Sequence, residues 1–171
     1  RGLGDVYKRQ DYFFVAAGDN VFLGDNVAER LLKLHRELGG AAMAGKRVED
    51  PRRYGVIVGR RLSDSVVKLE RIVEKPKDPP SNLANTSLYL LPPRVFEALE
   101  ECKPSPRGEI ELTDAVQLLV EWGEEVYVYD VGSAHWVDVG TPETYLDAIL
   151  LSLKACNEPR MVEKANRALK L

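Results

Sequence analysis

The chain has few long apolar runs, few cysteines and no excess of basic residues, and each of these absences excludes a class of protein. Its most apolar stretches, residues 13–17 and 146–151, fall far short of the roughly 18 to 20 residues that a membrane span needs. Its two cysteines, Cys102 and Cys156, have neither a metal-ligand spacing nor the density of a secreted disulfide scaffold. We therefore expect a cytoplasmic protein with reduced thiols and no membrane contact.

Histidine is equally scarce, which disfavours hydrolytic chemistry. Neither His35 nor His135 stands at motif spacing from a serine, a cysteine or the other histidine, so a catalytic triad has no support. Glu109 and Glu111 are more typical of a solvated approach to a helix than of a glycosidase pair. What the chain does have is 171 residues, 44% of them hydrophobic and 30% charged, which is enough for one globular domain with a sizeable core.

The first ten residues, RGLGDVYKRQ, correspond residue for residue to one reading frame of a transposase sequencing adapter. We interpret residues 1–10 as a non-native segment, so the natural sequence is expected to start at Asp11. These ten residues carry three cations and one anion, and setting them aside changes the net charge from −3 to −5. An acidic balance disfavours nucleic acid as a partner, and anionic substrates would need local positive charge.

Hydrophobic periodicity predicts alternating strands and helices. Residues 12–17 are expected to form a buried strand that ends at Gly18-Asp19-Asn20, followed by a helix from the N-cap Asn26 to Gly39-Gly40. Further strands are expected at residues 41–48, 56–61, 66–73, 86–91 and 126–131, and further helices at residues 95–99, at 112–122 and from the N-cap Thr141 onward.

This order predicts an α/β fold with a mixed, mainly parallel nucleotide-binding-type sheet, which is Rossmann-like and carries an antiparallel excursion through residues 41–91. We expect one domain over residues 11–155 and a helical tail over residues 156–171, centred on Val162 and Leu169. Sheets of this kind bind ligands beyond the carboxyl ends of their strands.

Two aspartates stand where apolar stretches end. Asp19 follows the first predicted strand, and Asp138 comes just before Thr141. Each has an ordinary explanation on its own, as a turn aspartate or as a carboxylate near a positive helix terminus. Two carboxylates at strand ends, completed by water and substrate phosphates, are also what Mg²⁺ needs. Asp19 and Asp138 are therefore candidate metal ligands if the fold brings them together.

The adjacent residues Glu74 and Lys75 offer a hydroxyl acceptor and an ammonium that can pair with phosphate. Pro76 favours an extended conformation at this point, in which the two side chains would diverge unless the loop bends. An exposed charge pair at a hairpin edge is the competing interpretation.

The same excursion holds four more candidates. Gly55, where a strand begins, suits a close backbone approach by a ligand, or is simply a turn residue. Asn85, Thr86 and Tyr89 are polar groups on an otherwise apolar strand, and if they are buried they need partners from a ligand or from a neighbour.

Five segments, in this order, resemble the sugar-1-phosphate nucleotidylyltransferases, and most of all those that transfer a thymidylyl group to glucose 1-phosphate. They are GDNVF, VEDPRRYGV, VEKPKDPPSNLANTSLYLL, KPSPRGEIELTDAVQLL and WVDVGTPETYL, which cover about residues 11–152. Each segment alone is a weak signal, but five in register identify the family. The resemblance implies a nucleotide-binding α/β sheet with a sugar-binding subdomain.

The resemblance also implies an activity. Members of this family catalyse the attack of a sugar-1-phosphate oxygen on the α-phosphorus of a nucleoside triphosphate such as dTTP or UTP, giving a nucleotide sugar and pyrophosphate without a protein nucleophile. Members commonly form homo-oligomers. The resemblance implies that Asp19 and Asp138 bind Mg²⁺. It implies that Glu74 binds the sugar hydroxyls, that Lys75 binds the sugar phosphate, and that Gly55 makes a backbone contact with the sugar. The wall of the pocket would be formed by Asn85, Thr86 and Tyr89.

Two departures from the family pattern affect this interpretation. Where the family usually has Thr-Gly, this chain has Thr86-Ser87, which alters a close backbone approach. The glycine-rich G-x-G-x-R-L loop, with its phosphate-binding arginine, is absent from the 171 residues. We expect the domain to be incomplete at its N-terminus, and this polypeptide to lack transfer activity although its parent encodes the enzyme.

Two alternatives stay open. One is a non-catalytic sugar-nucleotide-binding or regulatory subunit that keeps the fold without the phosphate loop. The other is a structural α/β interaction module in which Asp19 and Asp138 lie far apart on the surface. The sequence does not distinguish dTTP from UTP, or glucose from a related hexose.

Overall fold

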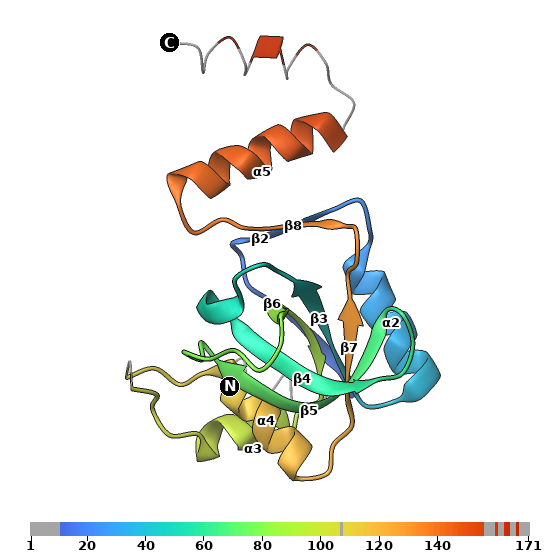
Figure 1. Ribbon diagram of the computed structural model, residues 1–171. Coiled ribbons are helices and arrows are strands. Elements are labelled where there is room, and N and C mark those ends of the chain that lie inside the picture. Colours follow the sequence, from blue (N-terminus) through green and yellow to red (C-terminus); the bar gives the residue numbers. More distant parts are fainter. Residues whose placement is uncertain (1–10, 107, 156–159, 161–162, 165–166, 168–171) are drawn as a thin grey trace, which may run out of the picture. The chain divides into compact units, whose positions relative to one another are not determined.

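The computed structural model describes residues 11–106, 108–155, 160, 163–164 and 167. The chain forms two compact units (Figure 1). Unit 1 comprises the residues up to Ala16 together with Val27–Gly132, and unit 2 comprises Ala17–Asn26 together with the residues from Ser133 onward. No helix in the described part of the chain has the length and apolarity to cross a lipid bilayer.

A six-stranded sheet forms the centre of unit 1. Its strands, in spatial order, are β1 (Phe13–Ala16), β6 (Leu83–Leu91), β3 (Ala41–Arg47), β7 (Val126–Asp130), β5 (Val66–Glu74) and β4 (Gly55–Arg61). The short 3-10 turn η1 (Pro51–Arg53) precedes β4. The α/β class and the mixed sheet predicted from the sequence are confirmed.

The direction of the strands differs from the expectation of a mainly parallel sheet. Among the described pairings only β3 with β7 is parallel, and β1–β6, β3–β6, β4–β5, β4–β6 and β5–β7 are all antiparallel. The reason is that the excursion through residues 41–91 supplies four of the six strands, β3 to β6, without a crossover helix between them. The β4–β5 hairpin and the return of β6 antiparallel to β1, β3 and β4 account for four of the five antiparallel pairings.

Helices cover both faces of this sheet. On one face, α3 (Val95–Glu101) and α4 (Leu112–Glu121) bury Val95, Val116 and Leu119 in the main core, together with Met43 of β3. The neighbouring Ala42 and Ala44 are also buried, but strand alternation turns them to the opposite face. There α2 (Val27–Leu38) packs against β3, β6 and β7. The small alanines allow this helix to lie close to the sheet.

Unit 2 is a two-stranded antiparallel ribbon with one helix. β2 (Asn20–Leu23) pairs with β8 (His135–Asp138), so that Asn20 lies opposite Asp138. α5 (Pro142–Ala155) begins as predicted at Thr141, whose Oγ1 accepts a hydrogen bond from the Thr144 N–H at 3.2 Å. The predicted tail helix around Val162 and Leu169 lies outside the described residues.

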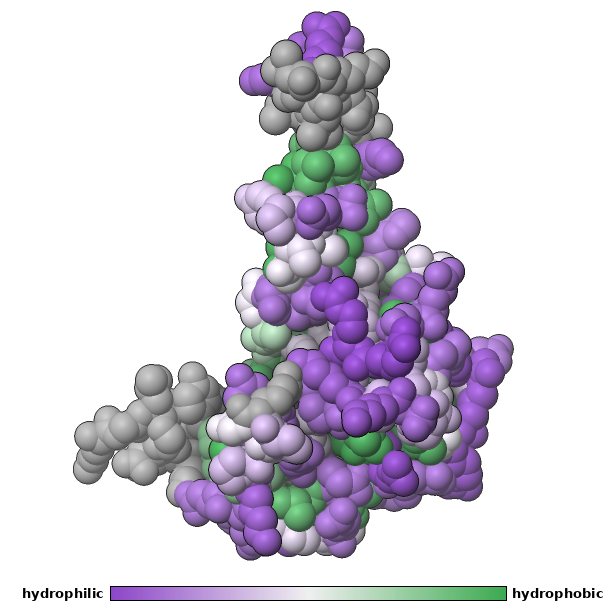
Figure 2. All heavy atoms as spheres, turned by 60° about the vertical axis from the view of Figure 1, so that its left-hand side comes forward, coloured by the Kyte–Doolittle hydropathy of each residue, from purple (hydrophilic) through white to green (hydrophobic). Residues whose placement is uncertain are grey.

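The surface of the two units differs in character. Figure 2 shows polar residues over most of the visible face of unit 1, and apolar residues gathered over the segment that carries α5. On that helix Tyr145 is 59% exposed and Ile149 is 37% exposed.

Candidate functional site

A bend in the backbone brings Glu74 and Lys75 together in unit 1. Lys75 adopts a φ of +42°, and its N–H donates to the Tyr54 carbonyl oxygen at 3.0 Å. The Lys75 Nζ atom lies 3.7 Å from Glu74 Oε1, with side-chain exposures of 43% and 20%. The loop therefore bends where an extended chain would separate the two side chains. A carboxylate and an ammonium are presented side by side.

Gly55 lies opposite Glu74 in the β4–β5 register and is closely surrounded. A Cβ atom at this position would lie 2.9 Å from Thr113 Cγ2 and 3.1 Å from Glu74 Oε2. The close contacts that leave no room for a side chain at position 55 are therefore made by protein atoms.

Thr113 was not among the residues singled out from the sequence. It is buried in the first turn of α4, and its Oγ1 donates to Glu74 Oε2 at 3.0 Å. Its position three residues before the buried Val116, on the same face of the predicted helix, was the available signal. Thr113 holds the Glu74 carboxylate in place from the helix side.

The polar residues of β6 are buried, and neighbouring groups satisfy them. Asn85 is 5% exposed, Thr86 0% and Tyr89 2%. The Asn85 Nδ2 atom donates to the Tyr89 hydroxyl at 2.5 Å, whereas Thr86 Oγ1 donates to the carbonyl oxygen of Ala44 at 3.0 Å. The structure therefore groups Asn85 and Tyr89 with each other and bonds the Thr86 hydroxyl to β3.

Tyr89 titrates far from its usual range. Burial raises the pKa of its phenol well above the ordinary value, and the nearby Glu74 carboxylate raises it further. The hydrogen bond that Asn85 donates to the phenol acts in the opposite direction on this pKa and is outweighed. At neutral pH the phenol is protonated, so Tyr89 can donate a hydrogen bond in this group.

The two candidate metal ligands lie together in unit 2. Asn20 faces Asp138 across the β2–β8 ribbon, and the Val139 N–H donates to the carbonyl oxygen of Asp19 at 2.8 Å. Asn20 Nδ2 donates to Asp19 Oδ1 at 2.8 Å, while Asn20 Oδ1 accepts from Trp136 Nε1 at 2.6 Å. Since directly opposed residues project from the same face of a ribbon, Asp138 lies on the face that carries Asn20, and the Asn20 amide holds the Asp19 carboxylate by its hydrogen bond.

The donor set of this ribbon fits a hard divalent cation that keeps most of its own ligands. Within the described residues no cluster of three or more histidine, cysteine, aspartate or glutamate side chains could hold a metal ion. Asp19 is exposed and Asp138 is partly exposed, so water and phosphate oxygens can reach both. Mg²⁺ is commonly held by one or two carboxylates together with waters and substrate phosphates.

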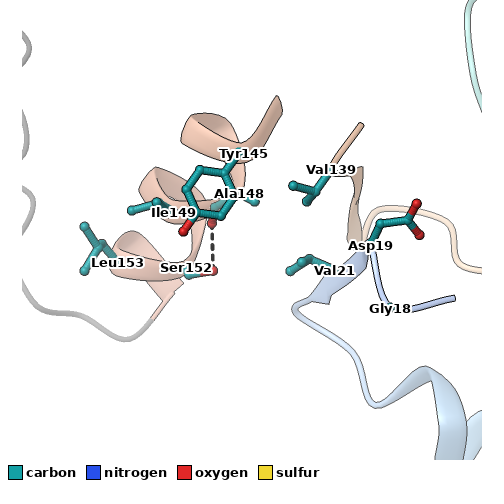
Figure 3. Close-up of a pocket in the computed structure, with 9 residues that line it drawn as sticks. All are labelled: Gly18, Asp19, Val21, Val139, Tyr145, Ala148, Ile149, Ser152 and Leu153. Carbon is teal, nitrogen blue, oxygen red and sulfur yellow. Dashed lines mark hydrogen bonds between the residues drawn. The ribbon is translucent and has the colours of Figure 1, made fainter. Parts of the chain in front are cut away.

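Unit 2 also contains a cavity of about 570 Å³ between the ribbon and α5 (Figure 3). It is lined by Gly18, Asp19, Val21, Val139, Tyr145, Ala148, Ile149, Ser152 and Leu153. The Asp19 carboxylate points away from the cavity, whereas Val21 and Val139 point into it. No lining residue, all of them in the described part of the chain, carries a positive charge. The cavity therefore does not suit a phosphate.

The amino-acid sequence of the chain matches that of known proteins. The profile of the family described as Nucleotidyl transferase matches residues 3–155. The chain belongs to this family. UTP–glucose-1-phosphate uridylyltransferase of Pseudomonas aeruginosa is 34% identical over 143 residues, which cover 80% of this chain and 50% of that protein. Glucose-1-phosphate thymidylyltransferase of Streptomyces griseus is 38% identical over 153 residues, which cover 88% of this chain and 41% of that protein.

Solved structures of this nucleotidyl transferase family agree with the sequence matches. The crystal structure of UDP-glucose pyrophosphorylase complexed with UDP-glucose matches with a TM-score of 0.78 and 30% identity, covering 90% of this chain and 62% of that chain. The chain spans about half the length of the curated relatives it matches. The family resemblance drawn from five sequence segments is confirmed.

Proposed function

We propose that the whole protein transfers a nucleotidyl group from dTTP or UTP to a sugar 1-phosphate, with glucose 1-phosphate as the acceptor, to give a nucleotide sugar and pyrophosphate. The observation that carries this proposal is the bend at Lys75, which sets an ammonium 3.7 Å from the Glu74 carboxylate. One group suits a phosphate and the other suits sugar hydroxyls. The names of the uridylyl- and thymidylyltransferase relatives support this choice of substrates.

In this reaction an oxygen of the sugar phosphate forms a bond to the α-phosphorus, and the bond from that phosphorus to the bridging oxygen of pyrophosphate breaks. Lys75 would pair with the sugar phosphate and offset its charge, while Glu74, held by Thr113, would accept hydrogen bonds from sugar hydroxyls. Tyr89 and Asn85 would form the wall beside them, with Gly55 at the start of β4. The residues bind and orient the acceptor, and none acts as a nucleophile.

Asp19 and Asp138 are the residues that would hold Mg²⁺. A bound Mg²⁺ would offset the charge of the phosphates and favour an in-line displacement. Asn20 keeps the Asp19 carboxylate in place by its hydrogen bond, and Trp136 in turn fixes the orientation of the Asn20 amide.

We further propose that the 171-residue chain binds the acceptor without completing the transfer, since its sequence holds no glycine-rich phosphate loop. A cytoplasmic location is supported by the free thiol of Cys102, and homo-oligomers are proposed from the family resemblance alone.

The test is a calorimetric titration of the chain with glucose 1-phosphate. The Lys75→Gln variant is expected to bind about tenfold or more weakly, because it loses a charge-assisted bond to phosphate. Lys77→Gln, which removes an exposed charge two residues away, is the matched control and should bind normally. Equal affinity of the unsubstituted chain and the Lys75→Gln variant for glucose 1-phosphate would contradict the acceptor site. Separately, steady release of pyrophosphate when the chain is mixed with glucose 1-phosphate, dTTP and Mg²⁺ would contradict the proposed inactivity.

A further inference from the structure

The second half of β5 has a strand neighbour on one side only. β4 pairs with β5 from Val67 to Glu74, whereas the pairing of β7 with β5 covers, in the described part of the chain, only Val66–Lys68. A strand edge without a neighbouring strand carries backbone groups that need other partners, above all where the strand is buried. Ile72, two residues before Glu74, lies in this stretch and is only 4% exposed.

The side chain of Gln117 supplies the missing partner at Ile72. Its Oε1 atom accepts a hydrogen bond from the Ile72 N–H at 2.9 Å, and its Nε2 atom donates to Glu121 Oε1 at 3.1 Å. Glu121 lies one turn further along α4. Since a flipped amide would bring its own N–H groups to the Ile72 N–H, the two bonds fix one orientation of the Gln117 amide.

α4 therefore holds the end of β5 at two points. Thr113 Oγ1 donates to the Glu74 carboxylate at 3.0 Å, and Gln117, four residues later on the same face of the helix, bonds the backbone of Ile72. The first bond orients the carboxylate, and the second holds the strand that carries it. Because hydrogen bonds weaken steeply with distance and angle, a shift of β5 away from α4 would weaken the bond between Thr113 and Glu74.

We propose that Gln117 is a positioning residue of the acceptor pocket. It holds the end of β5 against α4, so that Glu74 keeps its hydrogen bond from Thr113 and is correctly oriented toward the hydroxyls of a bound hexose 1-phosphate. Gln117 thus acts on the acceptor through Ile72 and Glu74. This inference rests on the proposed function, because it assumes that Glu74 and Lys75 bind a sugar phosphate.

The experiment compares the chain with its Gln117→Leu variant by amide hydrogen exchange and by calorimetric titration with glucose 1-phosphate. Leucine is similar in size but cannot accept from the backbone, so the Ile72 N–H should exchange about tenfold faster or more. The affinity for glucose 1-phosphate is expected to fall by about three- to tenfold, the usual effect of losing one hydrogen bond.

An exchange of the two polar groups tests the bond itself. In the double variant Gln117→Glu with Glu121→Gln, the carboxylate at position 117 can accept both from the Ile72 N–H and from the amide at position 121. We expect this variant to regain slow exchange at Ile72 and most of the affinity. Glu121→Gln alone keeps an oxygen that can accept from Gln117, so it is the matched control and should bind normally.

Two further variants separate positioning from stability. Val27→Ala truncates a buried side chain of α2, which packs against β3, β6 and β7, so it should unfold at a lower temperature and still bind glucose 1-phosphate normally. In a Thr113→Val background, adding Gln117→Leu should cause little further loss of affinity, because the bond through which Gln117 acts is already missing.

The outcomes separate this inference from the proposed function. If the unsubstituted chain binds glucose 1-phosphate and Gln117→Leu binds it equally well, the role of Gln117 is wrong and the acceptor site stands. The role is also wrong if exchange at Ile72 does not change, or if Gln117→Leu weakens binding as much with valine at position 113 as with threonine. If the folded, unsubstituted chain does not bind glucose 1-phosphate at all, both proposals fail.

Discussion

The Oγ1 atom of Thr113 donates to Oε2 of Glu74 at 3.0 Å, which joins the first turn of α4 to the end of β5. The two residues are 39 positions apart in the chain, and Thr113 is only 5% exposed. The helix thereby fixes one oxygen of a carboxylate whose other oxygen lies 3.7 Å from Lys75 Nζ. The hydrogen bond therefore contributes to the orientation of the Glu74 carboxylate.

We expect Thr113→Val, which has nearly the same shape, to weaken glucose 1-phosphate binding by about three- to tenfold, because the Glu74 carboxylate loses its donor. Thr113→Ser keeps the hydroxyl and should retain most of the affinity. Calorimetric titration measures both variants. Unchanged affinity in Thr113→Val would show that Glu74 is held by other contacts.

Gly55→Ala should destabilise unit 1. The added Cβ would lie 2.9 Å from Thr113 Cγ2 and 3.1 Å from Glu74 Oε2, so the free energy of unfolding is expected to fall by about 1 to 3 kcal/mol. Gly18→Ala is the matched control, since its Cβ would have no atom within 4 Å. Urea unfolding measures the difference.

A rescue variant makes the Gly55 prediction specific. Thr113→Ser removes the Cγ2 methyl group that the new Cβ would meet, so adding it to Gly55→Ala should restore part of the lost stability. If the effects of Gly55→Ala and Thr113→Ser on the free energy of unfolding are strictly additive, the contact with Thr113 Cγ2 is not the cause of the destabilisation.

Divalent cation binding should depend on both carboxylates of the ribbon. Mn²⁺, followed by its paramagnetic resonance signal, is the probe, because carboxylate and water ligands suit it as they suit Mg²⁺. Asp19→Asn and Asp138→Asn are each expected to weaken binding by about tenfold or more. Asp147→Asn removes the same negative charge from α5 and is the control, which should bind Mn²⁺ normally. Equal binding by all variants would refute the ribbon as the metal site.

Stability in acid should depend on Asp50. The Arg52 guanidinium, bonded to the Asp50 carboxylate at 2.8 Å, lowers the pKa of that group to about 2 in the folded chain. Since the folded pKa is depressed, the stabilisation is present above the unfolded value near 4 and is lost as the pH falls toward 2. Asp50→Asn should flatten the acid limb of the stability curve in this interval, as measured by urea unfolding at each pH. Asp78→Asn, in an exposed loop, should leave the limb unchanged.

Local patterns in the sequence predicted the longer elements well. The amphipathic spacing from Val27 and the cap at Thr141 placed α2 and α5 correctly, since caps and periodicity are properties of neighbouring residues. The family and the α/β class followed from segments in register.

Features set by distant contacts were not predictable in this way. β2 and β8 have four residues each, and each is paired only with the other. A strand this short does not show a recognisable hydrophobic periodicity in the sequence. The direction of a strand within the sheet depends on which distant strand it pairs with. The sequence pattern therefore did not predict that most of the strand pairings are antiparallel. Pro76 predicts an extended residue before it, whereas Lys75 bends and donates its N–H to Tyr54, a contact with a residue 21 positions away that local pattern does not reveal.

The pairing of Asn20 with Asp138 has a consequence for biosynthesis. During translation, β2 is made more than a hundred residues before β8, so the ribbon can form only after the intervening strands of the sheet have been made. Asp19 and Asp138 thus come together only after β8 has been made. A released chain that ends at residue 134 should already protect β3 to β7 from proteolysis, while β2 remains open to cleavage.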